Sequence, residues 1–304
     1  MKAKDYITKL IDVLESRTDI VWEKHPLLYK TWTFDLLKIQ SKRIAPTDKV
    51  ILITSGIHGE EIAGPLSLLT YMDKILDLIH TNGYKCIIYP LDNPSGFECG
   101  TRYNIDSDEW WCGNNDFLRY QLADGTITDE CKKDDTFKWY RSSDPELKQE
   151  LPLETALLHS LLRKDPLNQI VAHLDLHQDY ITPIEWSYVY FYTFSDTYQS
   201  IISEIKKHIP LLANTSISAG QSSGDMSNDN ACIMRHDGTI NDLFYRIWIP
   251  DTIAIETTGQ TPLPLAEKIN RLWIQWMVLL LNERASWWPK KNSSLRQNEW
   301  EKIY

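Results

Sequence analysis

Paired cysteines are missing from this sequence of 304 residues. Five cysteines occur, which is an odd number, and no two of them form a CxxC pair. The pattern argues against a disulfide framework and against a cysteine-based zinc site, and it favours reduced thiols in a cytoplasmic protein. The cysteines are Cys86, Cys99, Cys112, Cys131 and Cys232.

Long apolar runs are also missing. A transmembrane helix needs about 20 apolar residues, whereas the apolar run 276–281 has charged residues on both sides. The N-terminal segment lacks the uninterrupted apolar stretch of a signal peptide, and its apolar residues recur at the spacing of a helix over about 4–16. We therefore expect a soluble protein with no membrane partner.

Basic residues are in deficit, because 32 Lys and Arg stand against 42 Asp and Glu, a net charge of −10. Such a chain has no general attraction for nucleic acid or for an anionic membrane. The composition is 42% apolar and 24% charged, with 12 Gly and 14 Pro, which is typical of a globular protein and excludes collagen-like and disordered classes. No repeat and no linker divides the chain, so we expect a single domain over 1–304.

Short apolar segments alternate with stretches of helical periodicity. Strands are predicted at 49–54, 85–89, 169–176, 187–194 and 251–256. Helices are predicted at about 61–80, 151–163, 201–209 and 264–282. Strands that are nearly all apolar need helices on both faces of their sheet. The sequence therefore predicts an α/β fold with three layers, α/β/α.

Two long segments do not follow this alternation, and the C-terminal region is marked by its tryptophans. Residues 104–150 form an acidic insertion with several tryptophans, twelve acidic residues and six basic ones. Residues 213–230 are rich in Ser, Gly, Asn and Asp and predict a loop. A Trp-rich helical region occupies about 263–304 at the C-terminal end. Long loops in compact domains often carry function.

A histidine and a carboxylate follow the first predicted core strand. His58 and Glu61 are three residues apart in Ser-Gly-Ile-His-Gly-Glu-Glu, and Gly59 lets the backbone bend between them. A turn between a strand and a helix is where α/β sheets present ligand sites. An imidazole and a carboxylate suit Zn²⁺, although a solvated polar turn would show the same residues.

A second histidine lies at the end of another predicted strand. In the segment His-Leu-Asp-Leu-His, the residues His173, Asp175 and His177 point to one face. A buried strand does not place three ionisable groups on one face without partners. His177 can reach the same sheet edge as His58, Asp175 can hold the imidazole of a metal ligand through its other nitrogen, and His173 is predicted to be a buried core residue.

A carboxylate that could accept a proton ends the strand at 251–256. Glu256 follows an apolar run, and burial there raises the pKa of a carboxyl group, which suits a general base. The alternative is an acid at the end of a strand that points into water.

Taken in order, these motifs resemble the zinc carboxypeptidase superfamily, which includes the succinylglutamate desuccinylase and aspartoacylase branch. The resemblance runs from about residue 49 to residue 260. It implies a mixed, mostly parallel sheet of about eight strands and one catalytic zinc ion. The motifs are His58-Gly59-Glu60-Glu61, Asn93-Pro94-Ser95-Gly96-Phe97, Arg102, Asp175-Leu176-His177 and Glu256-Thr257-Thr258.

The resemblance also implies roles for individual residues. His58, Glu61 and His177 would be the zinc ligands. Glu256 would be the general base, and Arg102 would polarise the carbonyl of the bond that is cut.

The part of the family pattern that clamps a substrate carboxylate is altered. The family usually has an adjacent Asn-Arg pair, and no such pair occurs in the corresponding stretch 113–120. Asn115 and Arg119 are the candidates, since they would share a face of a helical turn, and Asn114 is an alternative. A guanidinium suits a carboxylate because it binds both oxygens. Tyr245 is the candidate for the family's tyrosine over the substrate.

The resemblance therefore implies a zinc-dependent amide hydrolase. We expect a metallocarboxypeptidase that removes a C-terminal or side-chain-linked amino acid from a peptide. An N-acyl-amino-acid deacylase and a non-catalytic peptide-binding module on the same fold are the alternatives. If residues 104–150 border the mouth of the site, their negative charge disfavours acidic substrates.

Overall fold

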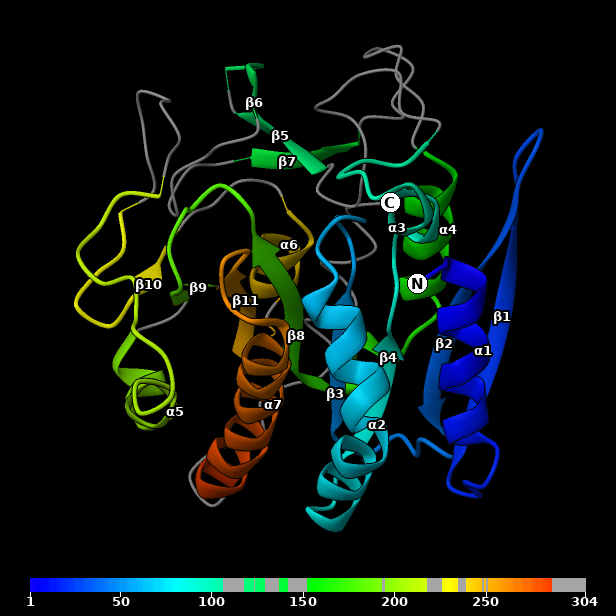
Figure 1. Cartoon of the computed structure of the whole chain (residues 1–304), viewed down its shortest axis with the longest axis horizontal. Helices are drawn as coiled ribbons and strands as arrows, with labels where there is room; N and C mark the ends of the chain where they lie inside the picture. Colours follow the sequence, from blue (N-terminus) through cyan, green and yellow to red (C-terminus); the bar gives the residue numbers. More distant parts are fainter. Residues whose placement is uncertain are drawn as a thin grey trace.

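A mixed sheet of eight strands, in the order β1-β2-β4-β3-β8-β11-β9-β10, forms the centre of the computed structural model (Figure 1). A second sheet has the order β6-β5-β7, with β5 at Leu118–Leu122, β6 at Ile127–Thr128 and β7 at Phe137–Arg141. The structure describes residues 1–105, 118–122, 124–128, 137–141, 152–192, 195–217, 226–234, 239–247, 249 and 251–285.

The four central strands are parallel to one another. They are β4 (Lys85–Tyr89), β3 (Val50–Ser55), β8 (Ile170–Asp179) and β11 (Asp251–Thr258). Every residue of β3 and of β11 is buried, because helices cover both faces of the sheet. This is why the sequence shows continuous apolar runs there, and why all four strands were predicted. β8 and β11 continue past their predicted ends.

The two margins of the sheet contain antiparallel pairs. β1 (Ile20–Leu28) and β2 (Thr33–Ser41) form a hairpin at one edge. At the other edge β9 (Ser187–Phe191) is antiparallel to β11, and β10 (Cys232–Ile233) is parallel to β9. Sequence analysis missed the hairpin and β10. β1 is an edge strand that contains Pro26 and mostly exposed or half-buried side chains, so it has no apolar run.

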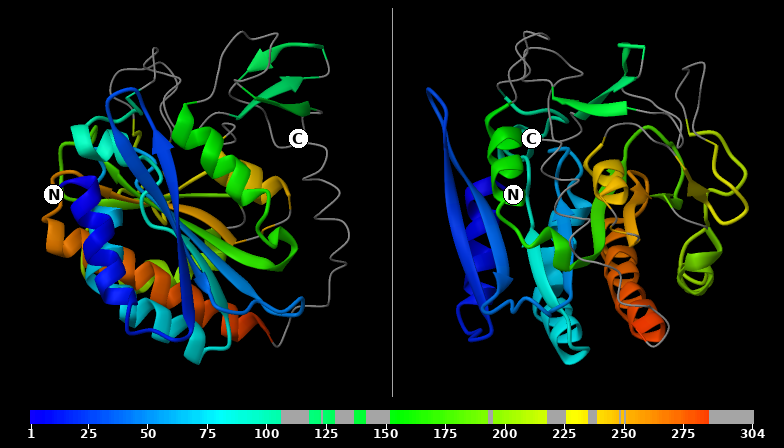
Figure 2. Two further views of the ribbon diagram at one scale, coloured as in Figure 1. Left: turned by 90° about the vertical axis from the view of Figure 1, so that its right-hand side faces the viewer. Right: turned by 180° about the vertical axis from the view of Figure 1, so that it is seen from behind.

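Helices cover both faces, which confirms the three-layer prediction (Figure 2). α1 (Ala3–Leu14), α2 (Ala63–Thr81) and α7 (Leu263–Ala285) lie on one face, and α5 (Gln199–Ile205) packs against α7. α4 (Leu153–Leu162) and α6 (Ile240–Arg246) lie on the other face. The remaining helices are α3 (Pro94–Cys99) and the short 3-10 helices Leu167–Gln169 and Ser195–Tyr198.

Most helices were predicted to within a few residues, whereas α3 and α6, of six and seven residues, were missed. Within the described part of the chain, no helix is long and apolar enough to cross a membrane. The carboxyl ends of β3, β8 and β11 reach the same edge of the sheet, where α/β proteins place their ligands.

Candidate metal centre

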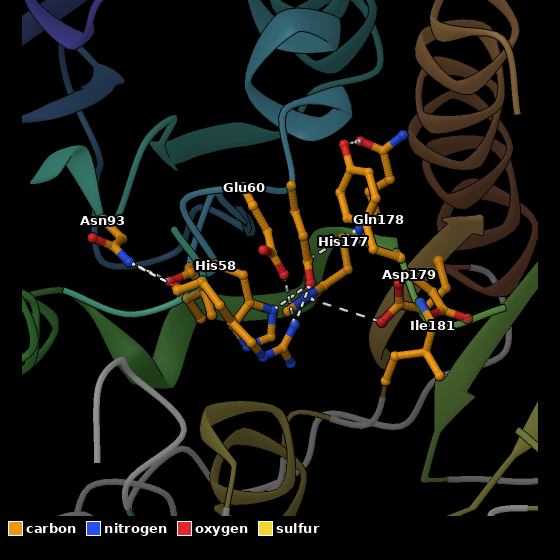
Figure 3. A network of polar contacts seen from close by, with 12 residues as sticks. His58, Glu60, Asn93, His177, Gln178, Asp179 and Ile181 are labelled. Atoms are coloured by element: carbon orange, nitrogen blue, oxygen red, sulfur yellow. Dashed lines mark hydrogen bonds and ion pairs between the residues drawn. The ribbon is translucent and has the colours of Figure 1, made fainter. Parts of the chain in front are cut away.

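His58 and Glu61 lie in the loop that follows β3 and are both buried. His58 Nδ1 is 2.6 Å from Glu61 Oε1. The spacing of three residues in this loop therefore brings an imidazole nitrogen and a carboxylate oxygen into contact. Figure 3 shows His58 pointing towards His177 at the end of β8.

His177 completes a cluster of three buried donors. Its Nδ1 is 2.9 Å from Glu61 Oε2, so the carboxylate of Glu61 lies between the two histidines. One donor atom from each of the three residues lies within 4.8 Å of the others, so the three donors face one position. Two imidazoles and one carboxylate are a catalytic zinc set that leaves a coordination position open. The donors fit the metal.

The charge state of Glu61 suits a ligand. Burial by itself would raise the pKa of this carboxyl group, but His58 and His177 hold the pKa well below its usual range. Metal binding needs a deprotonated carboxylate. The site therefore supplies this ligand in its anionic form.

Close packing of two loops places the ligand pair. Asn93 caps α3 by accepting a hydrogen bond from the backbone N of Gly96 at 2.8 Å, and its Nδ2 donates to the carbonyl oxygens of Ile57 and Arg102 at 3.2 and 3.1 Å. A Cβ on Gly59 would lie 2.1 Å from the carbonyl carbon of Gly96. The Asn-Pro-Ser-Gly motif thus supports the loop of His58, and Gly59 makes the close approach possible.

Replacing Gly59 by alanine tests this packing. The added Cβ would meet backbone, so the loop must shift; we expect Gly59→Ala to lower the free energy of unfolding by about 1–3 kcal/mol and to reduce zinc retention. Thermal unfolding and metal content are the measurements. Gly83→Ala is the control, since its Cβ has nothing within 4 Å but its φ is +80°: it should lower stability without changing zinc content. Normal zinc content in Gly59→Ala would show that the loop can accommodate the added Cβ without moving the ligands.

Glu256 lies beside the metal ligands on β11. It is opposite His177 in the register of β8 and β11, and its Oε1 is 4.0 Å from His177 Nδ1. The residue is 8% exposed, and Oε2 has no hydrogen-bond partner among the described residues. Burial raises the pKa of Glu256 well above its usual range, helped by the like charges of Glu61 and Asp179. A carboxyl group with these properties can take and return a proton.

Arg102 brings a positive charge to the same place. Its NH1 is 2.9 Å from Glu61 Oε1 and 3.7 Å from Glu60 Oε1. Its side chain is 38% exposed. This position suits a donor to an oxygen that becomes negative next to the metal.

Asp175 and His173, the other two polar residues of the predicted His-Leu-Asp-Leu-His segment, make different contacts. Asp175 Oδ2 is 2.9 Å from His177 Nε2, on the side of the ring away from Glu61. His173 Nε2 instead contacts the hydroxyl of Thr54 at 2.8 Å, and its ring packs on Phe244. His173 is therefore not among the clustered donors.

The predicted substrate residues that the structure describes, Arg119 and Tyr245, lie on two different elements. Asn115 and Asn114 lie outside the described residues. Arg119 lies in β5, paired with Tyr140 of β7, so the expectation of a helical turn shared with Asn115 is wrong. Pairing with β7 makes this segment a strand. Tyr245 lies on α6, where its ring stacks on Tyr192 with a centroid distance of 5.6 Å.

Sequence analysis missed two residues that border the site. Asp179 ends β8, and its Oδ1 accepts hydrogen bonds from the backbone N of Ile181 at 2.6 Å and of Thr182 at 3.2 Å. Tyr188 of β9 is opposite Glu256 in the register of β9 and β11, and burial together with the charge of Glu256 raises the pKa of Tyr188 well above its usual range. Asp179 has the same parity as His177, which was an available signal. The position of Tyr188 depends on strand pairing, so no signal in the sequence could have indicated it.

Comparison with known proteins agrees with this geometry. A family model described as zinc carboxypeptidase matches residues 31–277. A Shewanella baltica protein assigned as a metallopeptidase is 18% identical over 91% of each chain, with a TM-score of 0.65. Bovine thrombin-activatable fibrinolysis inhibitor, solved with tick carboxypeptidase inhibitor, is 14% identical over 94% of this chain and 96% of that one, with a TM-score of 0.56.

Carboxypeptidase A from Helicoverpa armigera is also similar in structure. It is 12% identical over 94% of this chain and 73% of that one, with a TM-score of 0.59. At such identities the similarity concerns the fold. Among curated proteins, no sequence matches the chain significantly.

Proposed function

Because the chain belongs to the zinc carboxypeptidase family and is therefore a zinc metallopeptidase, we propose that it is a metallocarboxypeptidase that removes a C-terminal or side-chain-linked amino acid from a peptide. His58, Glu61 and His177 hold one zinc ion in this proposal, and Glu256 is the general base. The observation that carries the proposal is the position of Glu256. Its buried side chain lies 4.0 Å from His177, a ligand of the predicted metal site, and its Oε2 has no hydrogen-bond partner among the described residues.

The proposed mechanism assigns one task to each residue of this chain. When bound, zinc supplies a Lewis acid that polarises the substrate carbonyl and lowers the pKa of water towards about 7. Glu256 accepts a proton from the attacking water and then delivers it to the leaving nitrogen. Arg102 donates hydrogen bonds to the carbonyl oxygen as negative charge develops there.

The altered clamp favours a second candidate activity. Without the adjacent Asn-Arg pair, the sequence does not provide the family's usual partner for a peptide C-terminus. An N-acyl-amino-acid deacylase of the succinylglutamate desuccinylase and aspartoacylase type uses the same zinc chemistry on a smaller amide. A non-catalytic peptide-binding module is less well supported, since the three donors and Glu256 are all present. The lack of paired cysteines supports action in the cytoplasm.

A substrate panel separates the two activities. The zinc-loaded protein would be given peptides with different C-terminal residues and, in parallel, a series of N-acyl amino acids. The proposal expects hydrolysis of the peptides, abolished by a chelator and restored by zinc. If only the N-acyl amino acids were hydrolysed, the protein would be a deacylase and the proposed carboxypeptidase activity would be wrong.

The charge of the site predicts a substrate preference. Glu60, with a side chain 35% exposed beside Arg102, adds to the negative charge of the acidic insertion 104–150. We expect peptides that end in lysine to be hydrolysed faster than glutamate-rich ones, with the difference reduced at high salt because exposed charges are screened. The measurement is kcat/KM for matched peptides at low and high ionic strength. Faster hydrolysis of the glutamate-rich peptides would contradict this prediction.

A further inference from the structure

The buried carboxylate of Asp175 is hydrogen-bonded to three residues, one of which is His177. Asp175 is fully buried, and its Oδ2 lies 2.9 Å from His177 Nε2 and 2.9 Å from Asn241 Nδ2. Its Oδ1 lies 2.8 Å from the hydroxyl of Thr54. Both oxygens are therefore held, and the carboxylate has little freedom to rotate.

The directions of these hydrogen bonds follow from the chemistry of the groups. An ionised carboxylate only accepts hydrogen bonds, and each of the three groups around Asp175 has a hydrogen that it can donate. His177 Nε2, Asn241 Nδ2 and the hydroxyl of Thr54 must all donate to it. Because the Thr54 hydrogen points to Asp175, its oxygen accepts from His173 Nε2 at 2.8 Å.

The network joins three elements that are distant in the sequence. Thr54 belongs to β3, Asp175 to β8, and Asn241 to α6. α6 packs on β8 and β11, and its Phe244 contacts the ring of His173, with centroids 4.6 Å apart. α6 thus covers the network and supplies one of its donors.

We propose that Asn241 and Thr54 are positioning residues of the metal centre, which hold the Asp175 carboxylate so that it accepts the Nε2 hydrogen of His177 and directs Nδ1 towards the metal. This rests on the proposed role of His177 as a ligand. A histidine held through one nitrogen has a defined tautomer and orientation at the other, and loss of such support costs about 10–100-fold in metal affinity or activity. Neither residue touches the metal donors directly; each acts through Asp175.

The test compares two buried asparagines. Asn241→Leu removes the donor to Asp175 and keeps the approximate shape. Asn270→Leu is the matched control, because Asn270 is also fully buried and its Nδ2 donates to Ser67 Oγ at 3.0 Å, in the contact between α7 and α2. Zinc dissociation constants come from competition with a chromophoric chelator in the absence of substrate, and thermal unfolding of the metal-free proteins reports stability.

We expect Asn241→Leu to weaken zinc binding about 10-fold and Asn270→Leu to leave it within about 2-fold, even if both lower the unfolding temperature. The ¹⁵N shifts of His177 give a second readout: in wild type only Nε2 should carry a proton when zinc is bound, and the variant should show a mixture or broadening. An unchanged zinc affinity and an unchanged His177 spectrum in Asn241→Leu would overturn the proposal.

A pair of threonine variants covers the case in which Asn241→Leu does not fold. Thr54→Val removes the hydroxyl and keeps the shape, whereas Thr54→Ser keeps the hydroxyl. Weakened zinc binding in the valine variant and recovery in the serine variant support the proposal; equal affinities in both overturn it. If wild type itself binds no zinc, the proposed function fails. If wild type binds zinc and these variants do not differ from it, only the positioning role fails.

Discussion

Glu256→Gln lowers the rate of amide hydrolysis by about 10²–10⁴-fold or more while zinc stays bound. Glutamine keeps the size of the side chain and most of its hydrogen bonds, but it cannot accept the proton of the attacking water. A group that acts only in the transition state affects turnover without weakening substrate binding. Zinc should remain, because Glu256 is on β11 and is not one of the three clustered donors.

The measurement is kcat and KM for a cleaved peptide together with zinc content in the same preparation. Glu15→Gln, an exposed change at the end of α1, is the control and should match wild type. We expect kcat to fall and KM to change little. Loss of metal from Glu256→Gln, or turnover close to wild type, would mean that another group is the base.

Glu61→Gln behaves differently, because it removes zinc and activity together. Glu61 lies between two imidazoles, with contacts of 2.6 Å to His58 and 2.9 Å to His177. Replacing a charged ligand by a neutral amide should weaken zinc binding by more than the roughly 10–100-fold that loss of a supporting residue costs. Added zinc should restore part of the activity, which it cannot do for Glu256→Gln.

Glu60→Gln is the matched control for this prediction. Glu60 precedes Glu61 in the same loop, but its half-exposed carboxylate contacts Arg102 and is not among the clustered donors. Zinc titration of both variants by competition with a chelator decides the outcome. If Glu60→Gln loses zinc as readily as Glu61→Gln, the assignment of the ligands is wrong.

The central strands could be predicted because their environment imposes a local pattern. Because they are covered on both faces, β3 and β11 contain the apolar runs 50–53 and 253–255, and such runs are visible without the fold. The hairpin of β1 and β2 shows no such apolar run in the sequence, since its edge strand β1 is partly exposed and pairs only with β2 among the described strands. The strand that contains Arg119 was missed for a related reason, because it is defined by pairing with β7 and not by a local pattern.

The candidate site also has residues that the sequence indicated and residues that only the structure revealed. The sequence by itself indicated the candidate ligands His58, Glu61 and His177 and the candidate base Glu256, because each lies near the carboxyl end of a predicted strand, at the edge where parallel strands meet. Only the tertiary structure decided that Asn241 supports Asp175 and that Tyr188 lies beside Glu256, since these contacts come from α6 and from the register of β9. Residue type and local spacing carry ligand chemistry, whereas contacts between distant elements depend on packing and register that no local pattern encodes.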